Sequence, residues 1–448
     1  MPKKKTALTI EERLQQALVP ADEQPYEVPE NWVWVRLGEI VDILNGDRGK
    51  NYPAKSTLSK EGIPFISAAN LCDNVVVEDD LLCMSEEQYN KLSAGKLRRN
   101  DIVLCIRGSL GKHGKFPFEK GAIASSLVIL RSKDRDALTD DYVMQYLDVP
   151  LFYDEIKKYD NGTAQPNLAA KNLELFLIPL PPFSEQQRIV ERIEELFAKL
   201  DEAKERLQEA ADSFAVRKAA ILHKAFTGEL TKQWRRENGV SDASWEEKKL
   251  SEITENQDSK RIPLSKSQRD NMNRIYDYYG ASGIIDKVDD YIFEGKKLLI
   301  GEDGANLVTR SKDIAFIADG KYWVNNHAHI LDVKDTVLLM YLCHYINNMD
   351  LIPYVTGSAQ PKLTQAKMNN IKIFLPTLSE QHEIVRLIDD LLARERSAQQ
   401  ATEQALASID LMKKSILARA FRGELGTNKA SEASALELLR QVLAENRS

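Results

Sequence analysis

A long segment of this chain occurs twice, and this internal repeat constrains the fold more than any other feature of the sequence. The segment from Ser184 to Leu230 matches the segment from Ser379 to Leu425 at a constant shift of 195 residues, without a gap. Both copies begin with SEQ, and they end with KxxILxKAFxGEL and KxxILxRAFxGEL respectively. A match of this length between distant segments indicates an internal duplication, so the sequence predicts two equivalent structural units.

Both copies have the apolar periodicity of one long helix, with steps of four and three residues that are typical of a coiled-coil seam. The seam of the first copy contains Ile189, Ile193, Leu196, Leu200, Ala203, Leu207, Ala210 and Phe214. The seam of the second copy contains Ile384, Ile388, Leu391, Ala398, Ala405, Ile409, Met412 and Ile416. Glu395 and Thr402 interrupt the second seam, which we expect to be weaker in its middle. Each helix would be about 65 Å long at about 1.5 Å per residue.

The ends of both helices carry capping signals. Ser184, followed by Gln187, is predicted to be the N-cap of a capping box, and Ser379 is predicted to cap the second helix. Gly228 and Gly423 stand where a left-handed C-cap residue is expected.

A lone helix with such a seam would expose it to water, and the chain contains a matching partner. We therefore expect the two helices to pack together, antiparallel, in the self-complementary arrangement that two-fold related elements share with dimers. The alternative is that each helix packs only on its own domain.

Length and composition indicate a soluble, multidomain chain. Its 448 residues, 43% hydrophobic and 29% charged, suggest about three domains, which the repeat refines to two globular units and a helical spacer. The sequence has no apolar run that would span a membrane or serve as a secretory signal. The four cysteines show no paired spacing, so we expect reduced, mostly buried thiols and a cytoplasmic location.

The net charge of −7 is not typical of a nucleic-acid-binding protein, which usually has a basic net charge, but the charge is unevenly distributed. Residues 96–120 contain seven basic and two acidic residues, and residues 260–274 contain five basic residues and one acid. Each cluster could contact phosphate or could simply be a solvated surface.

Two α+β domains precede the repeated helices, and each places its strands before its main helix. In the first we expect strands at 64–67, 101–106 and 126–130, with a helix at 139–157. In the second we expect strands at 295–301, 314–317 and 328–331, with a helix at 335–348.

The beginnings and ends of the two domains match, whereas their middles differ. Residues 34–40 resemble residues 245–253, and residues 161–168 match residues 356–363 at the same shift of 195 before short strands at 175–181 and 371–376. Within the matched exits, Gln165 and Gln360 could contact a ligand or merely form turns. The two openings are 211 residues apart, so the first domain carries sixteen extra residues. This pattern favours one shared scaffold with two different recognition surfaces.

Motifs for catalysis are not found. The stretch from Gly108 to Phe116 fails the phosphate-binding GxxxxGK[ST] pattern, because one residue too many separates its glycines and Phe116 replaces the hydroxyl residue. Residues 180–183, LPPF, lack the polar residue with which an amino-methyltransferase holds its target amine. His327 and His329 make a poor zinc site, and we expect them to pair with local polar groups instead.

Taken together, the repeated SEQ and KxxILx[KR]AFxGEL segments, the opening PYEVPENW at Pro25–Trp32 and the AQPxL exits resemble the specificity subunit of type I restriction-modification systems. The resemblance covers nearly the whole chain. It implies an α+β fold in which two target recognition domains, with mixed sheets and helices, are joined and spaced by the two conserved helical regions of that family. The implied order is an N-terminal arm or helix (1–23), first target recognition domain (24–180), central helical spacer (181–235), second target recognition domain (240–376), distal helical spacer (377–426) and tail with a short helix (427–448).

The resemblance also implies a function. Each domain would read one half of a split, asymmetric site in double-stranded DNA, and the helices would fix the gap between the halves. The chain would have no catalytic residues and would bind no metal or cofactor. It would assemble with two methyltransferase subunits, which bind S-adenosylmethionine and methylate adenine, and with restriction subunits that use ATP and Mg²⁺.

Two alternatives remain open: a self-contained DNA adenine methyltransferase with unfamiliar motifs, and a structural coiled-coil adaptor. Binding of S-adenosylmethionine to the chain alone would favour the first, and absence of any DNA sequence preference in the complex would favour the second. Basic or polar side chains in turn-rich segments where the domains differ are our predicted DNA contacts. They are Arg48, Lys50, Arg107, Ser109 and Lys112 in the first domain, and Lys260, Arg261, Asn306 and Arg310 in the second.

Overall fold

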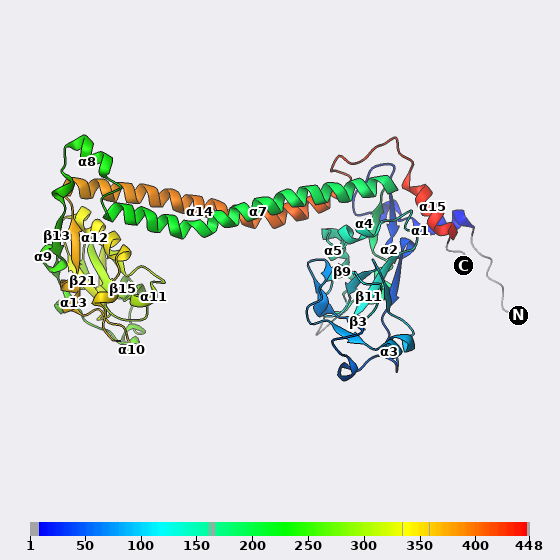
Figure 1. Ribbon diagram of the computed structural model, residues 1–448, viewed down its shortest axis with the longest axis horizontal. Helices are drawn as coiled ribbons and strands as arrows, with labels where there is room; N and C mark the ends of the chain where they lie inside the picture. The colour runs from blue at the N-terminus through cyan, green and yellow to red at the C-terminus, as the bar shows by residue number, and fades with distance from the viewer. Residues whose placement is uncertain (1–8, 161, 163–165, 334, 358, 446–448) are drawn as a thin grey trace. The chain divides into compact units, whose positions relative to one another are not determined.

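A computed structural model describes residues 9–160, 162, 166–333, 335–357 and 359–445, which form two compact units. The first unit consists of Met1–Arg206 and Ala405–Ser448, and the second of Leu207–Gln404. Two long helices, α7 (Phe183–Phe226) and α14 (Leu378–Ala420), contribute to both units. Figure 1 shows the elements of each unit.

The first unit contains short strands and helices around the ends of the two long helices. Its strands are β1 (Val33–Arg36), β2 (Val41–Asn45), β3 (Ile63–Ile66), β4 (Leu71–Cys72), β5 (Val75–Val76), β6 (Leu82–Met84), β7 (Lys96–Arg98), β8 (Ile102–Cys105), β9 (His113–Lys115), β10 (Lys120–Ile123), β11 (Leu127–Ser132) and β12 (Leu177–Leu180). Its shorter helices are α1 (Ile10–Ala17), α2 (Leu37–Ile40), α3 (Glu86–Lys91), α4 (Asp140–Tyr146), α5 (Pro150–Tyr159), α6 (Ala170–Leu173) and α15 (Ala435–Glu445).

The second unit has a similar composition of elements. Its strands are β13 (Glu246–Lys249), β14 (Glu255–Asn256), β15 (Tyr276–Gly280), β16 (Gly283–Val288), β17 (Phe293–Glu294), β18 (Lys297–Gly301), β19 (Ala315–Ala318), β20 (Lys321–Val324), β21 (Ala328–Asp332) and β22 (Lys372–Leu375). Its shorter helices are α8 (Lys232–Asn238), α9 (Leu250–Ile253), α10 (Lys266–Arg269), α11 (Asn306–Thr309), α12 (Thr336–Asn348) and α13 (Gln365–Asn369).

The sheets of the two units have the same topology. The order β2-β11-β8-β9 in the first corresponds to β14-β21-β18-β19 in the second, and both are antiparallel. The order β6-β3-β10-β7 corresponds to β16-β15-β20-β17, and each of these mixed sheets has its one parallel pair in the centre. The predicted α+β class and the predicted duplication of the domains are therefore confirmed.

The first unit differs by the strands β4 and β5, which extend its larger sheet beyond β9. They lie between residues 71 and 76, in the region where the sequence gives the first domain its additional residues. The helix predicted at 139–157 is in fact two helices, α4 and α5, because Pro150 begins a new helix at its N1 position.

The opening strand of each domain pairs with its closing strand. β1 pairs antiparallel with β12, and β13 pairs in the same way with β22. A backbone hydrogen bond next to each pair is also repeated: Leu37 N donates to Phe176 O (2.8 Å), and Leu250 N donates to Ile371 O (2.9 Å). These pairs bring both ends of each domain to the start of its long helix.

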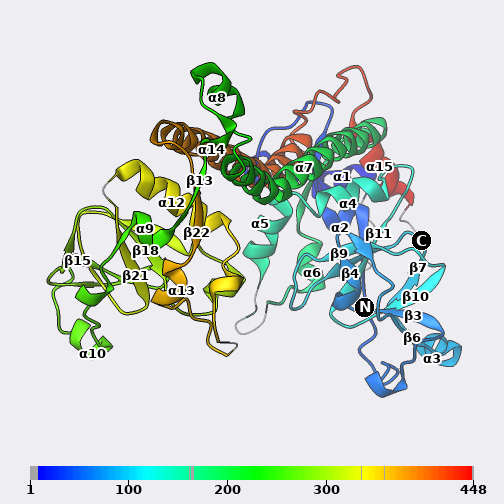
Figure 2. The same ribbon diagram turned by 60° about the vertical axis from the view of Figure 1, so that its left-hand side comes forward.

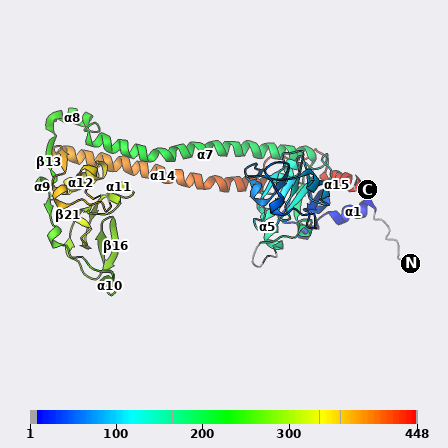
Figure 3. The same ribbon diagram turned by 60° about the horizontal axis from the view of Figure 1, so that its bottom comes forward.

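The two long helices pack against each other within each unit (Figure 3). In the first unit Asp201 of α7 accepts from Lys413 of α14 (2.6 Å), and in the second Arg217 donates to Glu395 (2.9 Å). Residue numbers rise along one helix as they fall along the other, so the packing is antiparallel, as predicted. The alternative, in which each helix packs only on its own domain, is therefore wrong, although the helices also pack on the domains.

The middle of the seam departs from the predicted pattern. Ala203, Ala398 and Met412 are exposed, although the periodicity assigned them to the seam. Conversely, the interrupting Thr402 is buried and Glu395 is half-buried in its ion pair with Arg217. Polar contacts therefore replace part of the apolar seam.

The prediction that Ser184 and Ser379 are the N-cap residues of the long helices is wrong. Both helices begin one residue before the predicted cap, because the carbonyls of Pro182 and Thr377 accept the first helical bonds from Gln186 N (3.1 Å) and Gln381 N (2.9 Å). Ser184 and Ser379 accordingly lie inside the first turn, and the capping box with Gln187 does not form. The predicted C-caps are confirmed: Gly228 and Gly423 have φ values of +76° and +73°.

Equivalent aromatic residues near the ends of the long helices complete the two cores. Phe421, which directly follows α14, stacks on Tyr142 in the first unit, with ring centroids 4.8 Å apart. Phe226 of α7 packs edge-on against Tyr341 and Tyr345 in the second, at 5.4 and 5.0 Å. In the first unit α4 lies between α7 and strand β11 (Figure 2), so the helix pair and the sheet share one core.

In the first unit, the first and last helices of the described chain, α1 and α15, lie side by side (Figure 1). Arg13 Nη1 donates to Leu443 O (2.5 Å), and Ala435 N donates to Asn31 O (2.9 Å). No helix in the described parts of the chain combines the length and the apolar character needed to cross a lipid bilayer. The four cysteines are free thiols, of which Cys72 is exposed.

Candidate nucleic-acid interface

Three of the predicted contact residues lie on one exposed turn between β8 and β9. Arg107, Ser109 and Lys112 are all exposed there. Hydrogen bonds from Cys105 N to Lys112 O (2.7 Å) and from Gly111 N to Cys105 O (3.2 Å) close the turn. The turn therefore presents a guanidinium, a hydroxyl and an ammonium group to solvent.

Arg48 and Lys50 lie on a second exposed loop, which follows β2. The buried carboxylate of Asp47 shapes this loop, because it accepts from Gly49 N (2.7 Å) and from the backbone and hydroxyl of Ser93 (2.8 and 2.9 Å). The bond from Gly49, followed by those from Ser93, lowers the pKa of Asp47. Asp47 thus remains a charged acceptor that fixes the backbone of its neighbours.

A third segment, 124–126, links these two loops. Arg48 Nη2 lies 3.5 Å from Ser125 O, and Ile106 N donates to Ser126 O (2.9 Å). All five residues predicted for the first domain therefore lie along one edge of it.

Ion pairs neutralise much of the basic stretch at 96–120. Arg99 pairs with Glu119 (2.8 Å), Lys115 with Asp141 (2.8 Å) and Lys120 with Glu86 (2.6 Å). Within the described residues, Arg107 and Lys112 make no ion pair. The charges of Arg107 and Lys112 on the β8–β9 turn are thus available to a polyanion.

In the second domain, Lys260 is exposed as predicted, but Arg310 has a structural role. Arg310 has a left-handed backbone (φ 52°), and its Nη2 donates to the carbonyls of Asn347 (2.8 Å) and Ile346 (3.2 Å), while Nη1 donates to Met349 O. The side chain therefore satisfies the last carbonyls of α12, as basic residues commonly do at helix C-termini.

Asn306 and Arg261 are also engaged within the domain. The side-chain amide of Asn306 accepts from Lys312 N (2.9 Å) and donates to Lys312 O (3.1 Å), which closes the loop after α11. Arg261 Nη1 donates to Glu302 (2.7 Å) and Ala328 O (2.7 Å), and 13% of its side chain is exposed. Together with Arg310, these two side chains have structural partners that account for their positions, so we place all three outside the proposed contact surface.

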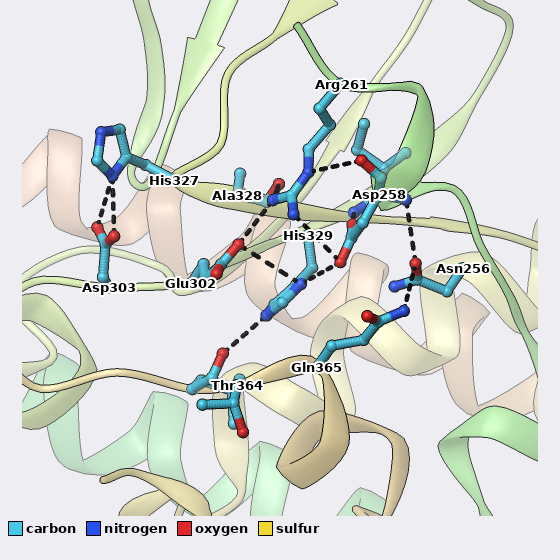
Figure 4. Close-up of polar contacts among 12 residues, drawn as sticks. Asn256, Asp258, Arg261, Glu302, Asp303, His327, Ala328, His329, Thr364 and Gln365 are labelled. Carbon is cyan, nitrogen blue, oxygen red and sulfur yellow. Dashed lines mark hydrogen bonds and ion pairs between the residues drawn. The ribbon is translucent and has the colours of Figure 1, made fainter. Parts of the chain in front are cut away.

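Arg261 belongs to a polar cluster that joins three loops (Figure 4). His329 is buried, with Nδ1 2.6 Å from Asp258 Oδ2 and Nε2 2.7 Å from Leu363 O. Burial by itself raises the pKa of Asp258, but the hydrogen bond and charge of His329 outweigh it and lower the pKa. The same balance lowers the pKa of Glu302, where Arg261, His329 and Lys362 offset burial.

His327 and Asp303 form a separate pair beside this cluster (Figure 4). His327 Nδ1 lies 2.8 and 2.9 Å from the two carboxylate oxygens of Asp303. The prediction that His327 and His329 pair with local polar groups is therefore confirmed. The described residues contain no group of three or more His, Cys, Asp or Glu side chains arranged to hold a metal ion.

Sequence reasoning missed Asp303 and His327 as candidate contacts because they are 24 residues apart, in loops after different strands. The constant shift of 195 would not have found them, because it places Arg107 on Glu302. Only the structure shows that Asp303 and Lys362 form an isolated β-bridge just as Arg107 and Asn167 do.

Of the two glutamines in the matched exits, the structure describes only Gln360. Gln165 lies outside the described residues. Gln360 is exposed in a tight turn, which bonds between Thr356 and Lys362 close in both directions (2.8 Å each) and in which Gly357 has a φ of +84°. The turn prediction is confirmed for Gln360, and a ligand contact stays a prediction.

Comparisons with known proteins agree with this architecture. A family model described as a type I restriction modification DNA specificity domain matches residues 29–211 and again residues 243–406. The chain is 24% identical to the StySPI specificity subunit of Salmonella potsdam and to the EcoKI specificity subunit of Escherichia coli K12, over 94% of this chain and 96% of each relative. It is 40% identical to a putative type I specificity subunit of Haemophilus influenzae, over 34% of this chain and 38% of that protein.

Solved structures share the fold. The HsdS subunit from Thermoanaerobacter tengcongensis aligns with a TM-score of 0.65 over 90% of this chain and 99% of its own, at 18% identity. A chain from work on complex assembly and conformational transition of the type I R-M system aligns with a TM-score of 0.63 at 17% identity, over 89% of this chain.

Proposed function

Because the chain belongs to the type I restriction-modification DNA specificity family, we propose that its two domains each read one half of a bipartite, asymmetric DNA site. The relatives are named specificity subunits, and the chain is the non-catalytic, sequence-specifying component. Two methyltransferase subunits would bind S-adenosylmethionine and methylate one adenine in each half-site. Restriction subunits would supply the ATP- and Mg²⁺-dependent step.

The observation that carries this proposal is that two domains with the same strand order present different side chains at equivalent edges. A shared frame with different exposed groups is what two distinct half-sites require, because base edges in the major groove are distinguished by their donors and acceptors. The exposed Arg48, Lys50, Arg107, Ser109 and Lys112 would contact the first half-site, and Lys260 the second. Cationic side chains would supply phosphate contacts that position each domain.

Sequencing of methylated adenines tests this proposal in DNA from cells that contain the chain and its companion methyltransferase. We expect two short specified sequences, separated by a fixed unspecified gap, with one methylated adenine in each. A single continuous motif or random methylation would refute it. Binding of S-adenosylmethionine to the isolated chain would favour a self-contained methyltransferase.

The long helices would set the gap between the half-sites. Inserting seven residues into both helices, after Arg206 and after Gln404, would lengthen each by about 10 Å at about 1.5 Å per residue, and a heptad keeps the seam aligned to within about 20°. At about 3.4 Å per base pair, the preferred gap should widen by about three base pairs. The same insertion in one helix only is the matched control and should impair assembly rather than change the gap.

A further inference from the structure

The same backbone hydrogen bonds hold one loop in both domains. In the first, Gly108 N donates to Pro166 O (2.9 Å) and Leu168 N donates to Ile106 O (2.9 Å). In the second, the donors are Gly304 to Pro361 O (3.0 Å) and Leu363 to Glu302 O (2.8 Å). Arg107 and Asp303 therefore occupy equivalent positions.

A third shared bond extends this equivalence to the next loop. Ile106 N donates to Ser126 O (2.9 Å), and Glu302 N donates to His327 O (2.8 Å). His327 therefore stands where the first domain has Ser126. The frame is the same, but Arg107 is replaced by the pair of Asp303 and His327.

The two sites present opposite hydrogen-bonding groups. Arg107 is exposed, and only its Nε is engaged within the described residues, with Asn167 Oδ1 at 3.1 Å. Its two terminal amino groups form a fork of donors, which fits the O6 and N7 acceptors of guanine.

His327 presents its ring in a fixed orientation. Carboxylate oxygens only accept, so Nδ1 of His327 carries the hydrogen that is shared with Asp303. In the neutral ring Nε2 is then an acceptor. The side chain of His327 is 49% exposed, whereas that of Asp303 is 16% exposed.

The buried His329 shows what a purely structural histidine looks like in the same domain. Its side chain is 1% exposed, and both ring nitrogens have partners inside the cluster. In the part of the chain that the structure describes, Nε2 of His327 has no such partner (Figure 4).

We propose that His327, oriented by Asp303, is a specificity-determining residue of the second domain and accepts a hydrogen bond from an exocyclic amino group of adenine or cytosine in the major groove. This inference rests on the proposed function. Asp303 is a positioning residue, because it acts through His327. The equivalent position of the first domain reads guanine through Arg107. At this position one domain therefore donates hydrogen bonds to the DNA and the other accepts one.

The test is selection of binding sites from randomised DNA by the complete complex with its methyltransferase subunits. His327→Ala should reduce the preference at one base pair of one half-site by about tenfold or more. The other half-site should be unchanged. Arg107→Ala should weaken the preference for guanine at one position of that other half-site.

Asp303→Asn tests the positioning role. It should weaken the preference at the same base pair as His327→Ala, and the double variant should be no worse than His327→Ala alone, because residues that act as a unit are not additive. Lys296→Ala is the matched control: Lys296 immediately precedes β18, at the opposite end of this strand from Asp303, and its removal should leave all base preferences intact.

Two outcomes would overturn the inference while leaving the proposed function in place. They are an unchanged second half-site in His327→Ala and additive losses in the double variant. If the unmodified complex selects no sequence in either half, the proposed function itself fails. Thermal unfolding of each variant complex separates loss of contact from loss of fold.

Discussion

Each long helix carries a buried glutamate as its third residue, and the two glutamates are held by different donors. In the first unit, Glu185 Oε2 accepts from the indole of Trp32 (2.8 Å) and the amide of Asn428 (2.8 Å), and Oε1 accepts from Thr427 (3.3 Å). All three donors are neutral. They come from the start of the domain and from the segment after α14.

In the second unit, Glu380 has an indole and a hydroxyl in corresponding places but a cation in the third. Its Oε2 accepts from Trp245 (3.1 Å), and its Oε1 accepts from Thr231 and from Arg235, both at 2.6 Å. Side chains of both Glu380 and Arg235 are nearly inaccessible to solvent. The duplicated frame therefore keeps a buried carboxylate and an indole at each junction, while the third donor differs.

This difference shows which part of the junction the fold requires. A buried carboxylate must be fully hydrogen-bonded, because leaving a buried polar group without a partner is costly. The chemical identity of the donor is less restricted. The proposed DNA-contacting edges follow the same rule. The backbone hydrogen bonds around Arg107 and Asp303 are repeated in the two domains, whereas the side chains differ.

Glu380→Gln should have the largest effect on stability. The substitution keeps the shape of the side chain but leaves the buried guanidinium of Arg235 without this carboxylate, and breaking a buried pair in this way costs about 3–5 kcal/mol. Urea unfolding of the full chain measures the loss. A loss below about 1 kcal/mol would mean that Asp242, which lies 2.9 Å from Arg235, suffices to neutralise it.

Glu185→Gln should cost less, about 1–3 kcal/mol, because the donors around Glu185 are neutral and none is left as an unpaired charge. The same urea experiment serves for this variant. The comparison fails if Glu185→Gln is as destabilising as Glu380→Gln.

Neutralising the exposed lysines should have a smaller effect, and it should change DNA binding rather than the stability of the fold. Lys112→Gln in the first domain and Lys260→Gln in the second should each reduce the salt dependence of binding by about one counterion, with little change in base preference. Titration of DNA binding by the assembled complex at several salt concentrations measures the slope. Arg99→Gln is the control, since Arg99 is already paired with Glu119, and its slope should match the unmodified complex.

The smallest expected effect is an opposite response to acid of two pairs of carboxyl groups, one pair in each domain. In the second domain, the pKa values of Asp258 and Glu302 are lowered, because contacts with His329 and Arg261 outweigh burial. Their contribution to stability is therefore present above the ordinary carboxyl pKa of about 4 and is lost as the pH falls through the lower folded value.

In the first domain, burial raises the pKa values of Asp140 and Glu155. The contribution of these two carboxyls to stability therefore increases as the pH falls from the raised folded value towards about 4. Denaturant unfolding between pH of about 3 and 7, for the chain and for Asp258→Asn and Asp140→Asn, measures both trends. Asp258→Asn should flatten the loss at low pH, and Asp140→Asn should remove the gain. Parallel curves for all three proteins would contradict the assignment.

Sequence patterns alone predict the frame of this protein. Periodicity and the shift of 195 predicted α7 and α14, their antiparallel packing, the glycine C-caps at Gly228 and Gly423, and two matched α+β domains. These features follow from local rules, namely the spacing of apolar residues along a helix and the conformational freedom of glycine, so they can be read from neighbouring residues.

Which polar side chains are available to a partner depends on how the chain packs in three dimensions. Arg107 and Arg310 look alike in the sequence, yet one is exposed on a turn and the other closes the end of α12. His327 meets Asp303, and Trp245 meets Glu380, across separations that no periodicity encodes. A hydrogen bond or an ion pair depends on where distant backbone segments meet, and that is fixed by the packing of the whole domain rather than by the residues on either side.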